Sequence, residues 1–242
     1  MDNLKEKLEK GLKPLYDELF PKLDVEKETA FIMQWGDKFP IEKNTGILFV
    51  GKAVNGWAAK DKQSFEKLFA IHDQMKWVDN LWNPRKDDNS KKQYLTKQSA
   101  FWIVIKGIAS KYYEDVNQWY SHIAWSNLYK ISPNTSKGGG NPSKENIDKQ
   151  LDLCRRILKS EIEILSPKYV VLFTSGWESK TGFLWYINGK QHTKQINEIP
   201  WNGNNKIRVY NIIDTIFITS VHPQGKNEEK HINTIVELLK KY

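Results

Sequence analysis

The sequence predicts one α/β domain in which helices cover both faces of a mainly parallel sheet. Short continuous apolar runs, typical of strands buried on both faces, alternate with long segments of helical periodicity. This alternation persists along the chain without a linker-like stretch, so we expect a single domain over residues 1–242. Ten residues each of Trp, Tyr and Phe, within an apolar share of 39%, supply a sizeable core.

The first third of the chain contains one long helix, one strand and one irregular segment. Leucines at helical spacing near the start predict an amphipathic covering helix, which Gly11 and Pro14 weaken or divide. The apolar run within residues 46–51 is bounded by glycines and predicts the first central strand. A short helical stripe follows at residues 65–72, and residues 77–97 then have the mixed polar composition of an inserted loop.

The middle of the chain predicts a helix, a second strand and the clearest helix of the sequence. Apolar residues at helical spacing over 101–112 are followed by an apolar run that predicts a strand ending near Asn127. Ser143 can cap the next helix because its hydroxyl can accept a hydrogen bond from a free backbone N–H of the first turn. Ser166 and Pro167 end that helix.

The last third predicts two more core strands and a terminal helix. Residues 169–174 form an apolar run typical of a third buried strand, and residues 175–187 indicate a turn and a short helix. Residues 206–213 predict an edge strand or a hairpin arm, and residues 215–221 the fourth core strand. The apolar face over residues 232–239 predicts a final helix, whose C-terminal lysines suit the helix dipole.

The composition narrows the class of protein. The net charge of +8 attracts polyanions and indicates nucleic acid as a partner, although lysine-rich helices also serve only to keep a protein in solution. Cys154 is the only cysteine, which excludes an intrachain disulfide and fits a reducing compartment. The sequence shows no signal peptide and no run near the ~20 apolar residues that span a bilayer. We therefore expect a cytoplasmic monomer with no membrane partner.

The carboxyl ends of the predicted strands define a candidate site. In open parallel α/β sheets, ligands bind outside these ends, where four loops lie: residues 51–57, 126–142, 174–180 and 220–226. Each loop carries glycine, amide, hydroxyl or lysine groups, which suit an anion with base-like edges. Together the loops place on one rim the residues Lys52, Asn55, Asn127, Lys130, Lys137, Ser175, Lys180, His222 and Lys226.

Four segments resemble the uracil-DNA glycosylase superfamily. ILFVGKAVNG resembles the family's buried strand with its Gly-led loop, and FITSVHPQ resembles its strand followed by His-Pro. Between them, SNLYKISP and SPKYVVLF resemble an Asn-containing segment and a strand introduced by Pro-Lys. The resemblance implies a three-layer αβα sandwich with a short, mainly parallel central sheet, and a pocket for a nucleotide rotated out of DNA. It also implies hydrolysis of the N-glycosidic bond of a uracil-like base in DNA repair, with no cofactor and no metal.

The resemblance gives roles to individual residues. Asn127 is similar to the amide that reads uracil, because its carbonyl and NH₂ can meet the N3 donor and the O4 acceptor together, whereas cytosine presents the opposite pattern at position 4. A loop Asn that makes an Asx turn is the alternative. His222 is similar to the histidine that stabilises negative charge on the departing base, with an exposed turn before Pro223 as the alternative. Gly51 and Lys52 open the loop of the base pocket.

The first loop departs from the family pattern. Active relatives commonly place Asp, Asn or Glu two residues after the leading glycine, followed by Pro, where this sequence has Ala53 and Val54. Alanine cannot orient a water or offset positive charge on the sugar. Either Asn55 supplies the catalytic group, another residue does, or the bond is not hydrolysed. Trp57 is a candidate stacking platform for a base, with a core position as the alternative.

The other loops supply candidates for contacts with nucleic acid. Gln224 replaces the Ser that often follows His-Pro in the family, and Lys226 can compensate for the lost phosphate contact. Three consecutive glycines after Lys137 allow backbone N–H groups to approach a phosphate, with a flexible connection as the alternative. The candidate nucleic-acid-binding residues are Lys130, Lys137, Ser175, Lys180, Gln224 and Lys226.

Three functions stay open at this point. The first is a uracil-DNA glycosylase in which His222 stabilises the leaving base. The second is a non-hydrolytic protein of the same fold that binds nucleic acid or a nucleotide, which the departures from the family pattern favour. The third is a serine hydrolase that uses Ser175, Asp214 and His222. Phe173 argues against it, because the nucleophile motif requires glycine at that position.

Overall fold

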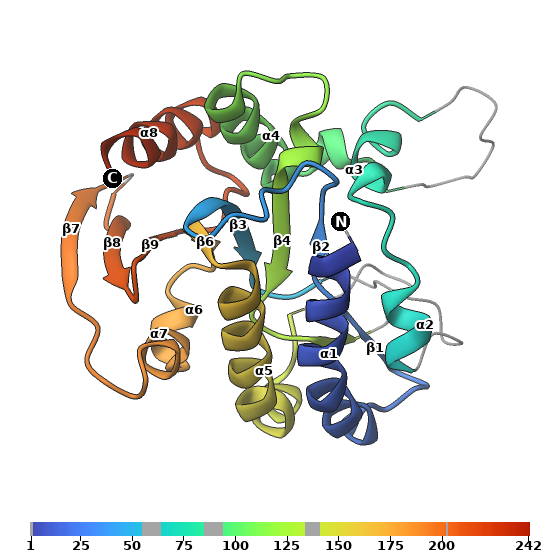
Figure 1. The fold of residues 1–242 in the computed structure, drawn as a ribbon. Coiled ribbons are helices and arrows are strands. Elements are labelled where there is room, and N and C mark those ends of the chain that lie inside the picture. Colours follow the sequence, from blue (N-terminus) through green and yellow to red (C-terminus); the bar gives the residue numbers. More distant parts are fainter. Residues whose placement is uncertain (1, 55–63, 85–93, 134–140, 202) are drawn as a thin grey trace.

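The chain folds around a seven-stranded mixed sheet, which confirms the predicted α/β class. The computed structural model describes residues 2–54, 64–84, 94–133, 141–201 and 203–242 (Figure 1). In spatial order the strands are β2 (Gln34–Trp35), β4 (Ile123–Asn127), β3 (Thr45–Gly51), β6 (Pro167–Phe173), β9 (Thr215–Ser220), β8 (Lys206–Ile212) and β7 (Gln195–Pro200).

The centre of the sheet is parallel and its margins are antiparallel. β4, β3, β6 and β9 run parallel to one another, whereas β2 pairs antiparallel with β4, and β8 pairs antiparallel with both β9 and β7. The segment predicted as an edge strand or hairpin arm, β8, is a hairpin arm between β9 and β7. The sequence analysis did not predict β7, because its residues are at most partly buried and show no clear apolar alternation.

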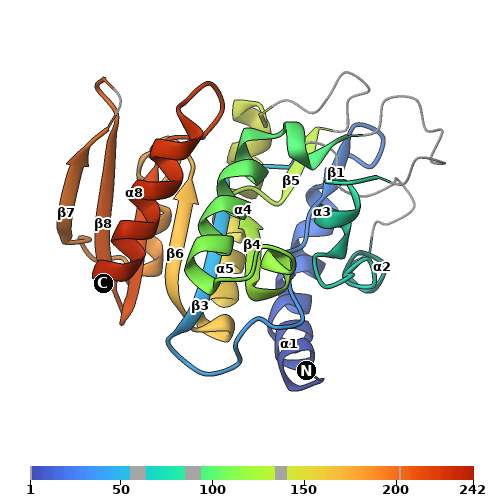
Figure 2. The same cartoon turned by 90° about the horizontal axis from the view of Figure 1, so that it is seen from above.

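Successive residues of the central strands belong to different hydrophobic clusters, one on each face of the sheet. In β3, Leu48 and Val50 join the cluster that includes the helices α1 (Asp2–Leu19) and α5 (Lys144–Leu165). Ile47 and Phe49 join the cluster that includes α4 (Ala100–Tyr113) and α8 (Glu228–Lys241), which lie next to each other over the sheet in Figure 2. The strands are therefore continuously apolar because both of their faces are covered.

The two helices α1 and α5 pack closely against each other. α1 continues through Gly11 and Pro14, so the expected division does not occur. A side chain at Gly11 would place its Cβ 2.5 Å from Cδ1 of Ile164, which explains why glycine is tolerated inside this helix. α5 begins as predicted, with the Ser143 hydroxyl accepting a hydrogen bond from the backbone N–H of Asn146.

Short elements complete the described part of the chain. The predicted helix at residues 65–72 is α2 (Phe65–Phe69). The segment predicted as an irregular insertion contains a helix, α3 (Lys76–Asn80), since Val78 packs into the core, and residues 85–93 lie outside the described residues. The remaining elements are α6 (Trp177–Lys180), α7 (Phe183–Ile187), the separate antiparallel pair of β1 (Glu28–Ala30) and β5 (Ile131–Pro133), and single helical turns at Phe20–Lys22, Thr96–Gln98 and Trp119–His122.

No helix in the described ranges combines the length and the apolar character needed to cross a bilayer.

Candidate functional site

The sheet has a switch in strand order at β3, and a large cleft lies there. The chain passes from β3 to β4 on one side and then to β6 on the other side of β3. The carboxyl ends of β3 and β6 therefore flank a crevice of the kind in which α/β proteins bind ligands. A cleft of about 1190 Å³ occupies this place, and residues of all four predicted loops line it. These are Gly51, Lys52, Ala53 and Val54; Asn127 and Asn141; Thr174, Ser175 and Trp177; and Val221, His222, Gln224 and Lys226.

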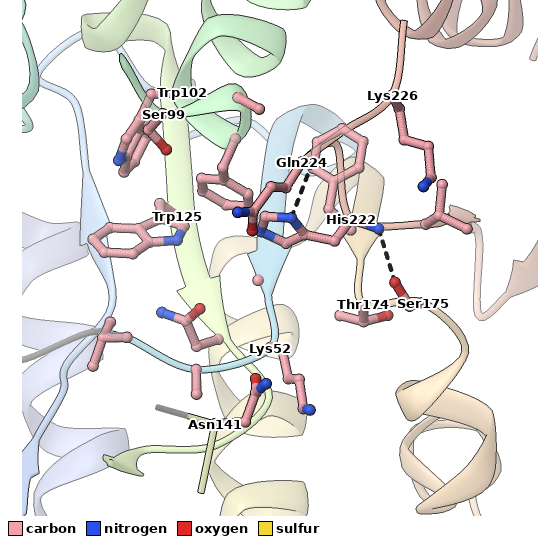
Figure 3. A pocket seen from close by; sticks show the side chains of 18 of the residues that line it. Lys52, Ser99, Trp102, Trp125, Asn141, Thr174, Ser175, His222, Gln224 and Lys226 are labelled. Carbon is pink, nitrogen blue, oxygen red and sulfur yellow. Dashed lines mark hydrogen bonds between the residues drawn. The ribbon is translucent and has the colours of Figure 1, made fainter. Parts of the chain in front are cut away.

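The cleft has an aromatic wall and a polar wall (Figure 3). Trp102 and Trp125 lie on one side of it, whereas His222, Ser175 and Lys226 lie on the other. The aromatic wall comes largely from α3 and from the segment before and within α4, which the sequence analysis did not assign to the site. The other residues of these segments that line the cleft are Trp77, Leu81, Tyr94, Gln98, Ser99, Ala100 and Phe101.

Asn127 is a buried amide at the wall of the cleft. Asn127 ends β4, and only 1% of the residue is exposed. The amide lies over Gly51 of the neighbouring strand, where a Cβ would come within 2.4 Å of Asn127 Oδ1. Asn127 Nδ2 has no hydrogen-bond partner among the described residues. An unsatisfied buried donor costs about 1–3 kcal/mol, and Asn127 lines the cleft, so its NH₂ group is a candidate contact for a ligand.

His222 follows β9 and presents its imidazole to the cleft in a defined protonation state. Nδ1 accepts a hydrogen bond from the backbone N–H of Gln224 at 3.2 Å, which requires a lone pair on Nδ1. Burial and the positive charge of Lys52 lower the pKa of His222. The neutral ring therefore carries its proton on Nε2, and its plane stacks on the Phe101 ring with centroids 5.9 Å apart.

Ser175 fixes the loop that carries His222. Its hydroxyl accepts a hydrogen bond from the His222 backbone N–H at 2.9 Å, and its own N–H donates to the Ser220 carbonyl at 3.1 Å (Figure 3). Ser175 has a left-handed backbone, with φ 55°, which turns the chain sharply at the end of β6. Two neighbouring parallel strands are thus tied together where they reach the cleft.

The geometry is wrong for the serine hydrolase that was considered from chain order. The Ser175 hydroxyl binds the backbone of His222 and not its imidazole, whose Nδ1 is occupied by the Gln224 N–H. Asp214 precedes β9 while His222 follows it, so a strand length of about 20 Å separates them. The residues therefore form no catalytic triad.

Lys52 brings a partly buried ammonium group to the cleft. Its Nζ lies 3.6 Å from the centroid of the Trp177 ring, a cation–π contact. Burial lowers the pKa of Lys52, and the nearby charge of Lys180 lowers it further. Lys180 itself is exposed on α6 and is not among the residues that line the cleft, so its influence on the site is electrostatic.

Lys130 does not contact the cleft, which corrects its assignment as a nucleic-acid-binding residue. Its side chain is 0% exposed, and its Nζ lies 2.8 Å from Glu161 Oε1 and 2.6 Å from the Ser126 hydroxyl. Burial raises the pKa of Glu161, and the Lys130 charge opposes that rise. The lysine points into the protein because its ammonium group pairs with Glu161 on α5, a contact that the local sequence does not reveal.

No acidic side chain is found among the described residues that line the cleft. Ala53 and Val54 both line it, at the positions where the family pattern has polar residues. Thr174, which does line the cleft, donates its hydroxyl hydrogen bond to the buried carboxyl of Glu178, which does not. The described part of the chain also gathers no group of three His, Cys, Asp or Glu side chains that would hold a metal.

Three predicted site residues lie outside the described residues: Asn55, Trp57 and Lys137. The glycines that follow Lys137 lie outside them as well.

The comparisons with known proteins add no relative. No family model matches the chain, and a search of curated proteins finds no match.

Proposed function

We propose that the chain is a uracil-DNA glycosylase-like protein whose cleft binds a uracil-like base rotated out of DNA. The observation that carries the proposal is that Asn127 and His222 line the same cleft and that Asn127 Nδ2 has no hydrogen-bond partner among the described residues. The resemblance to the superfamily also implies a three-layer αβα arrangement. Helices in the hydrophobic clusters of both sheet faces support that finer description.

The donors of the cleft match the edges of uracil. Asn127 Nδ2 donates to the O4 carbonyl, a position at which cytosine carries an NH₂ group and repels the donor. His222 Nε2–H donates to O2, where negative charge develops if the base departs. Burial and the charge of Lys52 lower the pKa of His222 and so keep its imidazole neutral near pH 7. The neutral imidazole donates a hydrogen bond without transferring its proton, so the base departs as a stabilised anion.

The cleft is larger than a single base requires. Binding pockets for drug-sized ligands span roughly 300–1,000 Å³. The cleft of about 1190 Å³ leaves space for the sugar and its flanking phosphates, next to Lys52 and Lys226. Its polar wall and the net charge of +8 fit DNA as the partner. A monomeric state and a cytoplasmic location stay predictions.

Base recognition is better supported than base removal. The His222 donor favours removal, because it stabilises the leaving anion. The described lining, however, offers no carboxylate that would activate a water. Hydrolysis is therefore the second candidate, and binding without hydrolysis is the first.

The test compares oligonucleotides that differ in one base. Purified protein is mixed with labelled single strands carrying uracil or cytosine at one position, and binding is measured by fluorescence anisotropy. We expect tighter binding to uracil by about tenfold, since one hydrogen bond that becomes a repulsion is worth about 1–3 kcal/mol. Asn127→Asp removes the NH₂ donor and should abolish the preference for uracil. Equal affinity of the native protein for both strands contradicts the proposal.

The same samples distinguish binding from base removal. After incubation, hot alkali cleaves any strand in which an abasic site has formed. Cleavage by the native protein that is lost in His222→Ala supports hydrolysis. Uracil preference without cleavage supports the non-hydrolytic function.

A further inference from the structure

Lys52 is an amine with the surroundings of a nucleophile. It directly follows β3, lines the cleft and lies with its Nζ against the face of Trp177. No acidic side chain of the described residues forms an ion pair with Lys52 or takes part in setting its charge state.

Burial and the charge of Lys180 increase the fraction of Lys52 that is uncharged. Only the neutral amine has a lone pair that can attack carbon. Burial and the neighbouring cation Lys180 both lower the pKa of Lys52, and these are the two physical means by which proteins activate lysine nucleophiles.

Lys52 lines the same cleft as the two residues of the proposed base site. The amide of Asn127 lies over Gly51, the residue that precedes Lys52. Asn127, His222 and Lys52 all line the cleft, so the sugar of a base held by Asn127 and His222 would lie in the cleft that Lys52 also lines. Lys52 and His222 both line the cleft, and the charge of Lys52 adds to burial in lowering the pKa of His222.

We propose that Lys52 Nζ forms an imine with C1′ of a deoxyribose that has lost its base. The lone pair of Nζ bonds to the carbonyl carbon of the open sugar. The carbonyl oxygen takes the two amine protons and leaves as water, so a carbon–nitrogen double bond remains. Water reverses the step and returns the free amine. The inference rests on the proposed function of the cleft as a DNA site.

The amine accounts for a cleft that lacks a carboxylate. Nucleophilic catalysis by lysine needs no activated water, because the amine itself attacks carbon. Ala53 in the first loop and the absence of Asp and Glu among the described lining residues are then compatible with chemistry on the sugar.

The experiment traps the imine. Full-length protein is incubated with a labelled oligonucleotide that already contains one abasic site, and sodium borohydride reduces any imine to a stable amine. We expect a covalent protein–DNA band, with the modification mapped to Lys52 by peptide mass spectrometry. Lys52→Arg keeps the positive charge but loses the nucleophile, so the band should fall about tenfold or more.

Two controls separate the chemistry from folding and from charge. Lys43→Arg changes a lysine at the opposite end of β3, about 23 Å away along the strand, and should leave the band unchanged. Binding of the same abasic oligonucleotide and the thermal midpoint are measured for each variant. A band that persists in folded Lys52→Arg, or no band with the native protein, overturns the inference.

The outcome is independent of base recognition. Because the abasic site is supplied ready-made, the band does not require that uracil be recognised. A band at Lys52 without any uracil preference would contradict the proposed base recognition alone. Uracil preference without a band would contradict the imine alone.

Discussion

At the scale of single residues, the cleft depends on a close contact between two strands. Gly51 is the β3 residue that pairs with Asn127, and the absence of a side chain there leaves room for the Asn127 amide. A Cβ at this position would lie 2.4 Å from Oδ1 of Asn127 and 3.4 Å from Cζ of Phe101. Glycine is therefore needed for space and not for an unusual backbone conformation.

Gly51→Ala should displace the Asn127 amide and disturb little else. The overpacking is expected to lower the free energy of unfolding by about 1–3 kcal/mol. The loss stays in this range because the atom that must move, Asn127 Oδ1, lies at the end of a side chain and not in the backbone. Affinity for the uracil oligonucleotide should fall about tenfold, which corresponds to about 1.4 kcal/mol. Anisotropy titrations measure the loss, and a cytosine oligonucleotide is the control whose affinity should barely change. Retained uracil preference in a folded variant would show that the amide does not read the base.

The positions of the cleft residues along the sheet edge could be predicted from the sequence more reliably than the directions of their side chains. Asn127, Ser175 and His222 follow strands whose apolar runs are unmistakable, so their place at the carboxyl edge could be predicted. Lys130 was assigned to the same edge, but its ammonium group turns inward to Glu161. A side-chain direction inside a loop depends on tertiary contacts, which a single sequence does not encode in its local pattern.

At the scale of elements, β4 is fastened to α5 by a buried ion pair. Lys130 lies just beyond β4, and its Nζ contacts both carboxylate oxygens of Glu161 on α5, at 2.8 Å and 2.9 Å. The Ser126 hydroxyl donates to the same carboxylate at 2.6 Å. This network lies beside Asn127 and holds the end of the strand.

Lys130→Met should destabilise the fold strongly, because it leaves the Glu161 carboxylate buried without its countercharge. Breaking one partner of such a pair costs about 3–5 kcal/mol, whereas replacing both by apolar groups is often neutral. The double variant Lys130→Met with Glu161→Leu should therefore recover most of the loss. Urea denaturation measures both variants. A loss below about 1 kcal/mol in the single variant would contradict a net role for the pair in stability.

The central strands could be predicted and the marginal ones could not. β3, β6 and β9 are buried on both faces and appear in the sequence as continuous apolar runs. β2 spans two residues, and β7 is largely exposed at the sheet margin, so neither leaves a periodic signal. The wall formed by α3 and the start of α4 was missed as part of the cleft because its aromatic residues also pack the core.

At the scale of the whole molecule, the region behind the cleft contains a buried histidine that resists protonation. His231 on α8 is 0% exposed, and its Nε2 lies 2.8 Å from the Ser220 hydroxyl at the end of β9. Trp201 and Phe173 pack against its ring, with centroids 4.5 Å and 5.1 Å away. Burial, aided by the neighbouring His222, lowers the pKa of His231 from 6.5 to about 4.

The fold should consequently lose stability in mild acid. Between pH 6.5 and about 4 the unfolded chain binds a proton at His231 that the folded chain does not, so the free energy of unfolding falls as the pH falls through this range and levels off below it. The depression of the pKa corresponds to a loss of about 3 kcal/mol. His72, whose pKa burial also lowers to about 4, adds a loss of the same sign. His231→Gln keeps a polar group near Ser220 but cannot titrate, so urea midpoints at pH 7 and pH 4.5 should differ less in this variant than in the native protein. An equal difference in both proteins would mean that the acid sensitivity arises from other groups and not from His231.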